Sequence, residues 1–112
     1  MPTSRKNHGV RKEYRRLCRQ LAAIGWICRG SAIKRSYQRP AAKGHQTYGP
    51  YYSWTRKVDN KTQTVALSLP QYRAVQSAIT QHRRVERILA RLRILSEQII
   101  FATTLGVLRR KR

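Results

Sequence analysis

Two runs with a two-residue period, residues 51–58 and 61–68, flank the dipeptide Asp59-Asn60. Asp and Asn tolerate the positive φ angles of a two-residue type I′ turn, so this dipeptide predicts a β-hairpin. The turn pairs Trp54 with Val65, and it sets one apolar face, made of Tyr52, Trp54, Val65 and Leu67. The other face is polar and carries Ser53, Thr55, Lys57, Thr62, Thr64 and Ala66. The sequence therefore predicts an antiparallel hairpin that is buried on one face only.

A long amphipathic helix is predicted to follow the hairpin. Ser68 can cap it while Gln71 reaches back, and Pro70 suits the first turn. Apolar residues then recur every three or four positions, at Tyr72, Val75, Ile79, Val85, Ile88, Leu92, Leu95 and Ile99. The phase slips near residues 82–84, which predicts a bend or break there. A helix that continues to about Thr104 would be roughly 50 Å long, so part of it is expected to project or to pair with a partner.

The N-terminal part of the chain predicts an arm and a second helix. Residues 1–9 are basic and aperiodic, which favours a flexible basic arm. One helical stripe then follows, made of Val10, Tyr14, Leu17, Leu21 and Ile24. Gly25 lies where helices commonly end in a left-handed residue.

The segment between this helix and the hairpin predicts a strand and a loop. Residues 26–37 have the pattern of a strand that bends at Gly30. Residues 38–49 contain Pro40, Gly44 and Gly49, and are predicted to be a loop. The expected fold class is α+β: an N-terminal helix, a three-stranded antiparallel sheet with a β-hairpin, and a long C-terminal helix on its apolar face. One domain is expected over residues 10–106, with a basic tail at 107–112.

The charge of the chain points to a polyanionic partner. The 112 residues include 25 Lys or Arg and 4 Asp or Glu, for a formal charge of +21. So many positively charged side chains repel one another unless a dense polyanion lies against them. Nucleic acid meets this condition, because each neutralised phosphate releases condensed counterions. An anionic membrane is disfavoured, since the cations are spread along the whole chain rather than along one amphipathic segment.

The apolar and cysteine content limits the class of protein further. The longest apolar cluster, residues 99–102, is far shorter than the ~20 residues that cross a bilayer. The N-terminus lacks the pattern of a secretory signal. Cys18 and Cys28 are too few for a disulfide framework and wrongly spaced for a metal knuckle. A buried Cys18 thiol and a cytoplasmic protein are therefore expected.

Catalysis finds little support in the sequence. The four acidic residues are Glu13, Asp59, Glu86 and Glu97. They are far apart, whereas general acid–base chemistry and metal-dependent hydrolysis use clustered carboxylates or histidines. Glu86 and Glu97 are expected to pair with arginines on their own helix. The chain is predicted not to be an enzyme and to need neither a metal nor another cofactor.

Cations interleaved with aromatic residues favour nucleic-acid binding instead. Lys and Arg can contact phosphates, and exposed rings can stack on unpaired bases. The predicted contact residues are Arg11, Lys12, Arg15, Arg16, Arg19, Arg29, Lys34, Arg35, Tyr37, Arg39, Lys43, Tyr48, Tyr51, Arg56, Lys57, Arg83, Arg84, Arg87 and Arg91. Tyr37, Tyr48 and Tyr51 are the rings expected to stack, whereas Tyr52 and Trp54 are assigned to the core.

RNA is favoured over DNA, because scattered charge suits embedding in folded RNA and no helix-turn-helix pattern is present. The expected role is an accessory subunit of a larger ribonucleoprotein. Its protein partner would dock on the long helix, through Leu92, Leu95, Ile99, Ile100 and Phe101. Two alternatives stay open. One is a ribosomal-type structural protein, and the other is a DNA-binding protein that reads a duplex with the polar face of its hairpin.

Several short motifs resemble a small uncharacterised bacterial family. They are Arg29-Gly30-Ser31, Lys34-Arg35-Ser36-Tyr37, Lys43-Gly44-His45, Gly49-Pro50-Tyr51-Tyr52, residues 54–58 and Lys61-Thr62. The family pattern is RGS-x-x-KRY, a cysteine knuckle, G-x-HGPYY, a hairpin with GKT at its turn, and a long helix. The resemblance covers residues 24–100 and implies a small accessory protein of mobile elements. The knuckle cysteines are absent from residues 36–44 here, so the implied metal site is lost and His45 is left without co-ligands.

The hairpin also resembles, more weakly, the three-stranded DNA-reading sheet of phage-type integrases. In those proteins the sheet enters the major groove, which admits a two-stranded ribbon. The resemblance implies that the polar hairpin face would be the reading surface.

Overall fold

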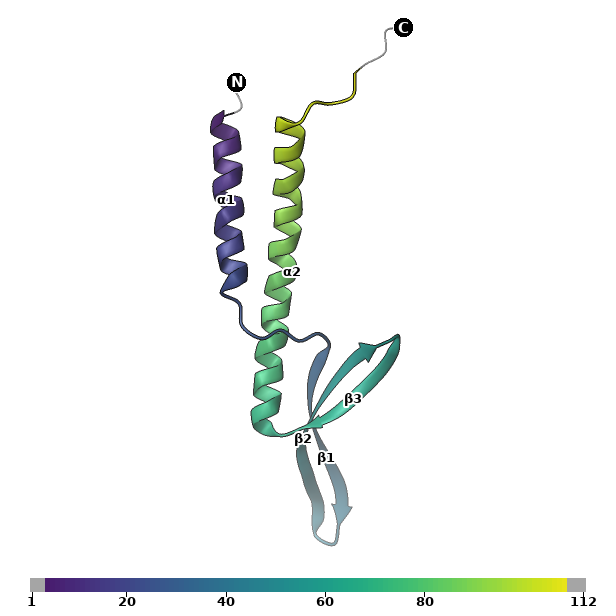
Figure 1. Ribbon diagram of the computed structural model, residues 1–112. Helices are drawn as coiled ribbons and strands as arrows, with labels where there is room; N and C mark the ends of the chain where they lie inside the picture. The colour runs from purple at the N-terminus through teal and green to yellow at the C-terminus, as the bar shows by residue number, and fades with distance from the viewer. Residues whose placement is uncertain (1–3, 109–112) are drawn as a thin grey trace. The chain divides into compact units, whose positions relative to one another are not determined.

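The computed structural model describes residues 4–108 of the chain. Its elements in chain order are α1 (Ser4–Ala22), β1 (Ser31–Ala41), β2 (Gly44–Val58), β3 (Lys61–Leu67) and α2 (Leu69–Thr103) (Figure 1). The strands form one antiparallel sheet in the order β1-β2-β3. The predicted α+β fold class, with its two helices and three strands, is confirmed.

The described residues divide into two compact units, and the single domain expected over residues 10–106 stays a prediction. We call residues 4–24 and 84–108 the helix-pair unit, and residues 25–83 the sheet unit. Helix α2 contributes residues to both units. The phase slip at residues 82–84 explains the division, because it marks the point where the apolar stripe of α2 changes partner. It does not mark a break, since α2 is one helix of 35 residues.

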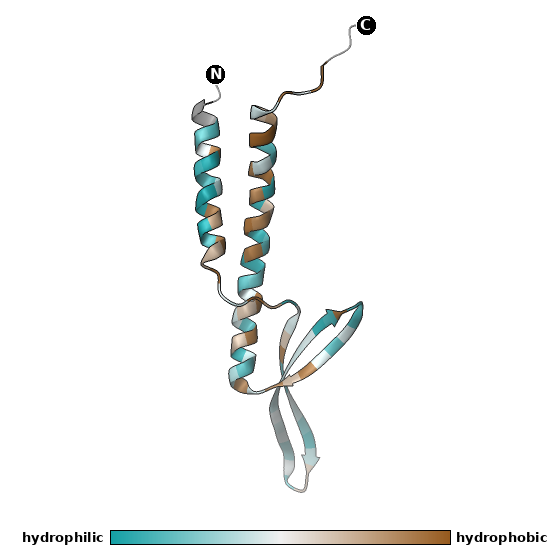
Figure 2. Cartoon of the chain, viewed as in Figure 1, coloured by the Kyte–Doolittle hydropathy of each residue, from teal (hydrophilic) through white to brown (hydrophobic). Residues whose placement is uncertain are grey.

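The helix-pair unit buries the apolar stripe of α1 against the C-terminal part of α2, which runs antiparallel to α1 (Figure 1). Leu95 is its most buried residue, at 1% exposure. The core consists of Leu17, Ile88, Leu92 and Leu95, with Val10, Leu21, Ile24 and Leu89 packed around it. Apolar residues recur along both helices accordingly (Figure 2). The predicted stripe is confirmed at Val10, Leu17, Leu21 and Ile24, whereas Tyr14 is 37% exposed.

Several N-terminal predictions differ from the structure. Helix α1 already begins at Ser4, so residues 4–9 are helical rather than a flexible arm. A glycine inside a helix costs only about 1 kcal/mol, so Gly9 does not stop it. The helix ends at Ala22, and Gly25 does not adopt the left-handed conformation. Cys18 is exposed, because it lies one position, or about 100°, around the helix from buried Leu17.

The predicted terminal segments fall partly outside the described residues. Residues 1–3 of the arm and residues 109–112 of the basic tail are not described. Val107 and Leu108, the first two residues of the tail, follow α2 in an irregular and exposed segment.

The β2–β3 hairpin has the predicted turn and register. Asp59 and Asn60 both have positive φ angles, of 51° and 65°. Trp54 lies opposite Val65, and Tyr52 lies opposite Leu67. Thr55 and Thr64 face each other on the other side, with their hydroxyl oxygens 3.1 Å apart.

The first strand begins later than predicted, and the prediction of a loop after it is wrong. Residues 26–30 are not in a strand, and the Cys28 amide donates to the Ala78 carbonyl of α2. Residues 38–49, predicted as a loop, instead extend β1 and β2 into a ribbon that turns at Ala42-Lys43. Gly30 has a φ of +94°, and a Cβ there would collide with the Thr55 carbonyl oxygen. Glycine is therefore required where the chain enters β1.

The N-terminal part of α2 packs on the apolar face of the sheet at Tyr52, whereas Val65 on the same face is 42% exposed. The Ser68 hydroxyl accepts from the Gln71 amide at 3.2 Å, and the Gln71 side chain accepts from the Ser68 amide at 2.9 Å. This reciprocal cap confirms the predicted start of the helix. The rings of Tyr72 and Tyr52 then pack at 4.6 Å between centroids. The apolar hairpin face is thus turned toward α2, as predicted.

Candidate nucleic-acid interface

The opposite face of the sheet gathers most of the chemistry expected of a nucleic-acid contact. Residues paired across an antiparallel ladder share a face, so Arg35 lies beside Tyr51, Tyr37 beside Tyr48, and Arg39 beside Gln46. We call this surface the open face: Ile33, Arg35, Tyr37, Arg39, Gln46, Tyr48, Tyr51, Ser53, Thr55, Lys57, Thr62, Thr64 and Ala66. These described residues include three cations and no acid.

A register shift explains how three tyrosines reach one face. Arg35 pairs with Tyr51, but Tyr37 pairs with Tyr48, so β2 contains one more residue than β1 between these pairs. Without that extra residue, the alternation of β2 would turn Tyr48 to the other face. Gly49 lies in the irregularity with a φ of +109°, and a Cβ there would come within 2.9 Å of the Arg35 carbonyl oxygen. Glycine at this position is therefore part of the arrangement.

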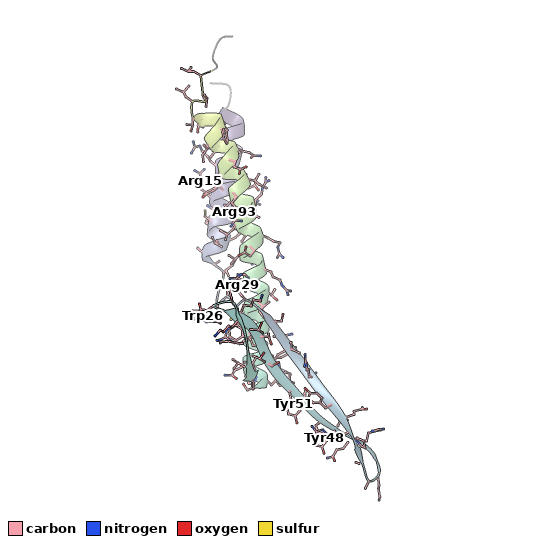
Figure 3. All side chains as sticks on the ribbon, turned by 90° about the vertical axis from the view of Figure 1, so that its right-hand side faces the viewer. Arg15, Trp26, Arg29, Tyr48, Tyr51 and Arg93 are labelled. Atoms are coloured by element: carbon pink, nitrogen blue, oxygen red, sulfur yellow. The ribbon has the colours of Figure 1, made fainter. Side chains whose placement is uncertain are left out.

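The tyrosines are close together and accessible. The ring centroids of Tyr37 and Tyr51 are 5.9 Å apart. Their residues are 49% and 54% exposed, respectively. The Arg39 guanidinium lies 5.5 Å from the centroid of the Tyr48 ring, which is also exposed. Tyr48 and Tyr51 both lie on the ribbon formed by β1 and β2 (Figure 3).

Four residues predicted to contact nucleic acid lie on or before the strands of the sheet unit but outside the open face. Lys34 is exposed on the opposite face, where it pairs with Tyr52. Lys43 lies at the ribbon turn, and Arg29 lies before β1. Arg56 stacks on Trp54, with its guanidinium carbon 3.9 Å from the ring centroid. Arg56 therefore packs on Trp54, and its contact with nucleic acid stays a prediction.

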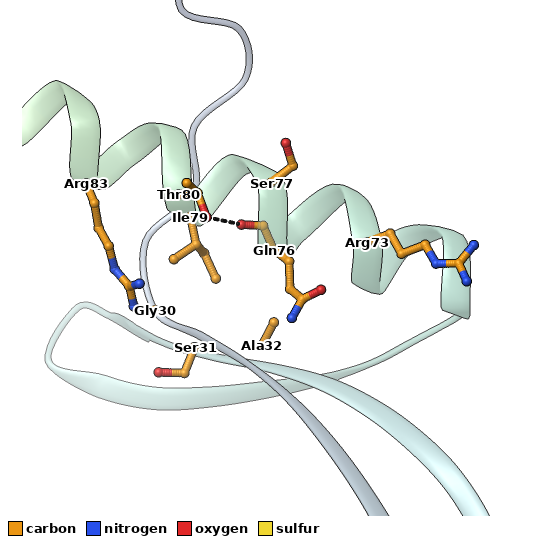
Figure 4. A pocket seen from close by; sticks show the side chains of 9 residues that line it. All are labelled: Gly30, Ser31, Ala32, Arg73, Gln76, Ser77, Ile79, Thr80 and Arg83. Atoms are coloured by element: carbon orange, nitrogen blue, oxygen red, sulfur yellow. Dashed lines mark hydrogen bonds between the residues drawn. The ribbon is translucent and has the colours of Figure 1, made fainter.

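A second basic surface of the sheet unit is a groove between α2 and the start of β1. Arg73 and Arg83 lie toward the two ends of this groove (Figure 4). They are ten positions apart on α2, which corresponds to about 15 Å along the helix axis. The lining between them is mostly small and polar, and includes Gly30, Ser31 and Gln76. Such a groove can hold a phosphate chain against two guanidinium groups.

The helix-pair unit holds the remaining predicted cations. Arg84, Arg87 and Arg91 are on α2, and the other five are on α1. All are exposed: Arg11, Lys12, Arg15, Arg16, Arg19, Arg84, Arg87 and Arg91. Arg11 and Arg15 edge an apolar groove that also contains Tyr14 and Ile99. Lys12, Arg16 and Arg19 line a second hollow, together with Glu13.

Arg91 is engaged by an acidic partner. Its Nε and Nη2 atoms donate to the two carboxylate oxygens of Glu13 at 2.8 Å and 3.0 Å. These hydrogen bonds lower the pKa of Glu13 below its ordinary value of 4.5, and they raise the pKa of Arg91. The pair joins α1 to α2, so Arg91 has a structural role, and its contact with nucleic acid stays a prediction.

This ion pair should make the stability of the helix-pair unit sensitive to acid. A carboxyl with a lowered folded pKa stabilises the fold above its unfolded pKa, and this contribution is lost as the pH falls through the folded pKa. The loss should therefore occur below about pH 4.5. We expect the thermal midpoint of Glu13→Gln to fall less at low pH than that of the wild type. Circular dichroism at a series of pH values below about 4.5 measures this midpoint. The control is Glu97→Gln on α2, and equal acid dependence in both variants and the wild type would contradict the assignment.

Two exposed side chains of the sheet unit were not among the predicted contact residues. Trp26, expected in a strand, is 91% exposed in the segment before β1. Arg73 was not among the predicted contacts, although it lines the groove with Arg83. The spacing from Arg73 to Arg83 was visible in the sequence, but only the fold shows that β1 begins beside that helix face.

The described residues offer no sign of a metal centre or a membrane span. Among residues 4–108, no group of three or more His, Cys, Asp or Glu side chains is placed to hold a metal ion. No helix in the same range is long and apolar enough to cross a membrane.

Comparisons with known proteins found no relative of this chain, because no family model, curated protein or solved structure matches it. The resemblance of the short motifs to a bacterial family stays a prediction.

Proposed function

We propose that this protein binds RNA without catalysing a reaction. The observation that carries the proposal is the open face, where Arg35, Arg39 and Lys57 lie among exposed tyrosines and hydroxyl groups. Such a surface can combine phosphate contacts with base contacts. In the three-stranded part of the sheet, α2 packs on the opposite face through the rings of Tyr72 and Tyr52, whereas the ribbon is exposed on both faces.

The distribution of charge supports a polyanionic ligand for the whole chain. In the sheet unit, ten Lys or Arg residues accompany a single acidic residue, Asp59. The helix-pair unit is also strongly basic, even with Arg91 paired to Glu13. A ligand that contacts both units would neutralise cations on each of them, as a folded RNA can.

Duplex DNA is a second candidate, and one observation favours it. Strand β3 pairs only with residues 52–58 of β2, so residues 35–41 and 44–51 form a two-stranded ribbon beyond the three-stranded part. Ribbons of this kind fit the major groove. RNA is preferred, because the ribbon carries exposed tyrosines, which stack on unpaired bases rather than on paired ones.

The proposed biological role is an accessory subunit of a larger ribonucleoprotein, as the motif resemblance implies for mobile elements. Ile100 and Phe101 on α2 are exposed and remain available for a protein partner, whereas Leu92 and Leu95 are buried against α1. That burial removes two residues from the predicted docking set. The two free cysteines fit a cytoplasmic location. Crosslinking in cells, followed by sequencing of the bound nucleic acid, would separate one specific RNA from ribosomal RNA and from DNA.

The open face can be tested with a matched pair of charge changes. Arg35 and Lys34 are adjacent exposed cations on opposite faces of β1. We expect Arg35→Gln to weaken RNA binding and to flatten its log–log salt dependence by roughly 0.7 per lost phosphate contact. Lys34→Gln removes the same charge and should change this slope much less. The measurement is fluorescence anisotropy with an unstructured RNA over a salt series.

Equal effects of the two substitutions would show that charge alone acts and that the open face is not the contact surface. Combining Arg35→Gln with Arg39→Gln should roughly double the change in slope.

A further inference from the structure

We propose that Tyr37, Tyr48 and Tyr51 form a stacking platform for unpaired bases, so that the ribbon selects single-stranded over duplex RNA. The inference rests on the proposed RNA binding and names the form of RNA that the open face takes. It is carried by the juxtaposition of three exposed rings with two arginines on one face of an otherwise polar ribbon.

The first step is that these rings have little role in the core. Tyr52 and Tyr72 show the contrast, since both are partly buried and pack on each other at 4.6 Å. Tyr37 and Tyr51 are about half exposed and contact each other at 5.9 Å with a tilt of 44°. The exposed rings of Tyr37 and Tyr51 are therefore available to stack on a flat ligand such as a base.

The second step is that an irregularity of the backbone places the rings together. Tyr48 reaches the open face only because of the register shift, and Gly49 in that shift has a positive φ of 109°. A regular ladder would leave Tyr37 and Tyr51 on this face and turn Tyr48 away. Bulges commonly re-aim a side chain in this way next to binding sites.

The third step is the position of the cations. Arg35 and Arg39 flank Tyr37 on β1 at two-residue spacing, so both side chains lie on the open face with the rings. Arg39 already lies over the Tyr48 ring at 5.5 Å. A strand whose bases stack on the rings would therefore find guanidinium groups beside its phosphates.

Selectivity follows from the geometry of the ligand. In a duplex, both faces of each internal base are already stacked on neighbouring bases. The tyrosine rings therefore find no free base face on which to stack. A duplex would gain only the phosphate contacts, whereas a single strand would gain these contacts and the stacking. Loss of one stacked base commonly lowers affinity by about tenfold.

The test compares two probes, an unstructured oligouridylate and an RNA duplex of the same length. We expect Tyr37→Ala combined with Tyr51→Ala to weaken oligouridylate binding by about 10- to 100-fold, with the duplex affinity and the salt slope unchanged. The Phe versions of both residues keep the ring faces and should keep the affinity. The control changes Gln38 and Thr47 to Ala, a cross-strand pair on the other face of the same ribbon.

Three results would overturn the platform. The Ala variant could lose affinity equally for oligouridylate and duplex, or the Phe variant or the Gln38/Thr47 control could lose as much oligouridylate affinity as the Ala variant. If the wild-type protein binds neither the oligouridylate nor the RNA duplex, the proposed function itself is refuted. A second test needs no variant, so misfolding of a variant cannot affect it. It uses the wild-type protein and an oligouridylate that carries a photoreactive uridine. Crosslinks to Tyr37, Tyr48 or Tyr51 support the platform, and crosslinks confined to other peptides contradict it.

Discussion

Leu95→Ala is expected to lower the free energy of unfolding of the helix-pair unit by about 3 kcal/mol. Leu95 is 1% exposed and packs in a core whose other buried members are Leu17, Ile88 and Leu92. Removing its branched end leaves a cavity that two helices with so small a core cannot easily close. Because small domains are only marginally stable, much of the helical circular dichroism signal from this unit should be lost at lower denaturant concentration.

Ile94→Ala provides the control for Leu95. It is the preceding residue of α2 and is 46% exposed, so the same kind of truncation should change the stability by less than about 1 kcal/mol. Equal losses in the two variants would show that α2 does not pack on α1 through the face described here.

Trp54→Ala is expected to destabilise the sheet unit by about 3 kcal/mol. The Trp54 indole donates a hydrogen bond to the Arg29 carbonyl at 2.7 Å, and its ring supports the Arg56 guanidinium at 3.9 Å. Its removal therefore deletes apolar packing, frees a backbone acceptor and leaves Arg56 without its stacking partner. Chemical denaturation followed by circular dichroism measures the loss.

The only other tryptophan is a matched control. Trp26 is 91% exposed, so Trp26→Ala should leave the stability of the sheet unit almost unchanged. A stable Trp54→Ala variant would mean that the two faces of the hairpin are assigned the wrong way round.

The parts of the fold that local chemistry determines were predictable from the sequence. Asp59-Asn60 specifies its turn through backbone preferences, and Ser68 with Gln71 caps α2 through contacts three residues apart. The ribbon beyond β3 was missed for the opposite reason. Residues 38–49 are exposed on both faces, so they show no apolar alternation, and their pairing depends on neighbours across the sheet.

The candidate site was predictable in its residue types but not in its geometry. Arg35, Tyr37, Arg39, Tyr48 and Tyr51 were all expected to contact nucleic acid, and the register places them on one face. The sequence does not reveal the register shift that turns Tyr48 toward the others. Nor does it reveal that Arg56 and Arg91 are engaged by Trp54 and Glu13, because those contacts depend on packing within each unit.

The measurement that tests the central claim most directly is the salt dependence of RNA binding by the unmodified protein. We predict tight binding to unstructured RNA in dilute buffer and a steep linear fall of the logarithm of the association constant with the logarithm of salt concentration, at roughly 0.7 per phosphate contact. A protein that leaves RNA and DNA unbound in dilute buffer, yet adheres to an acidic protein or to anionic vesicles, would contradict the account.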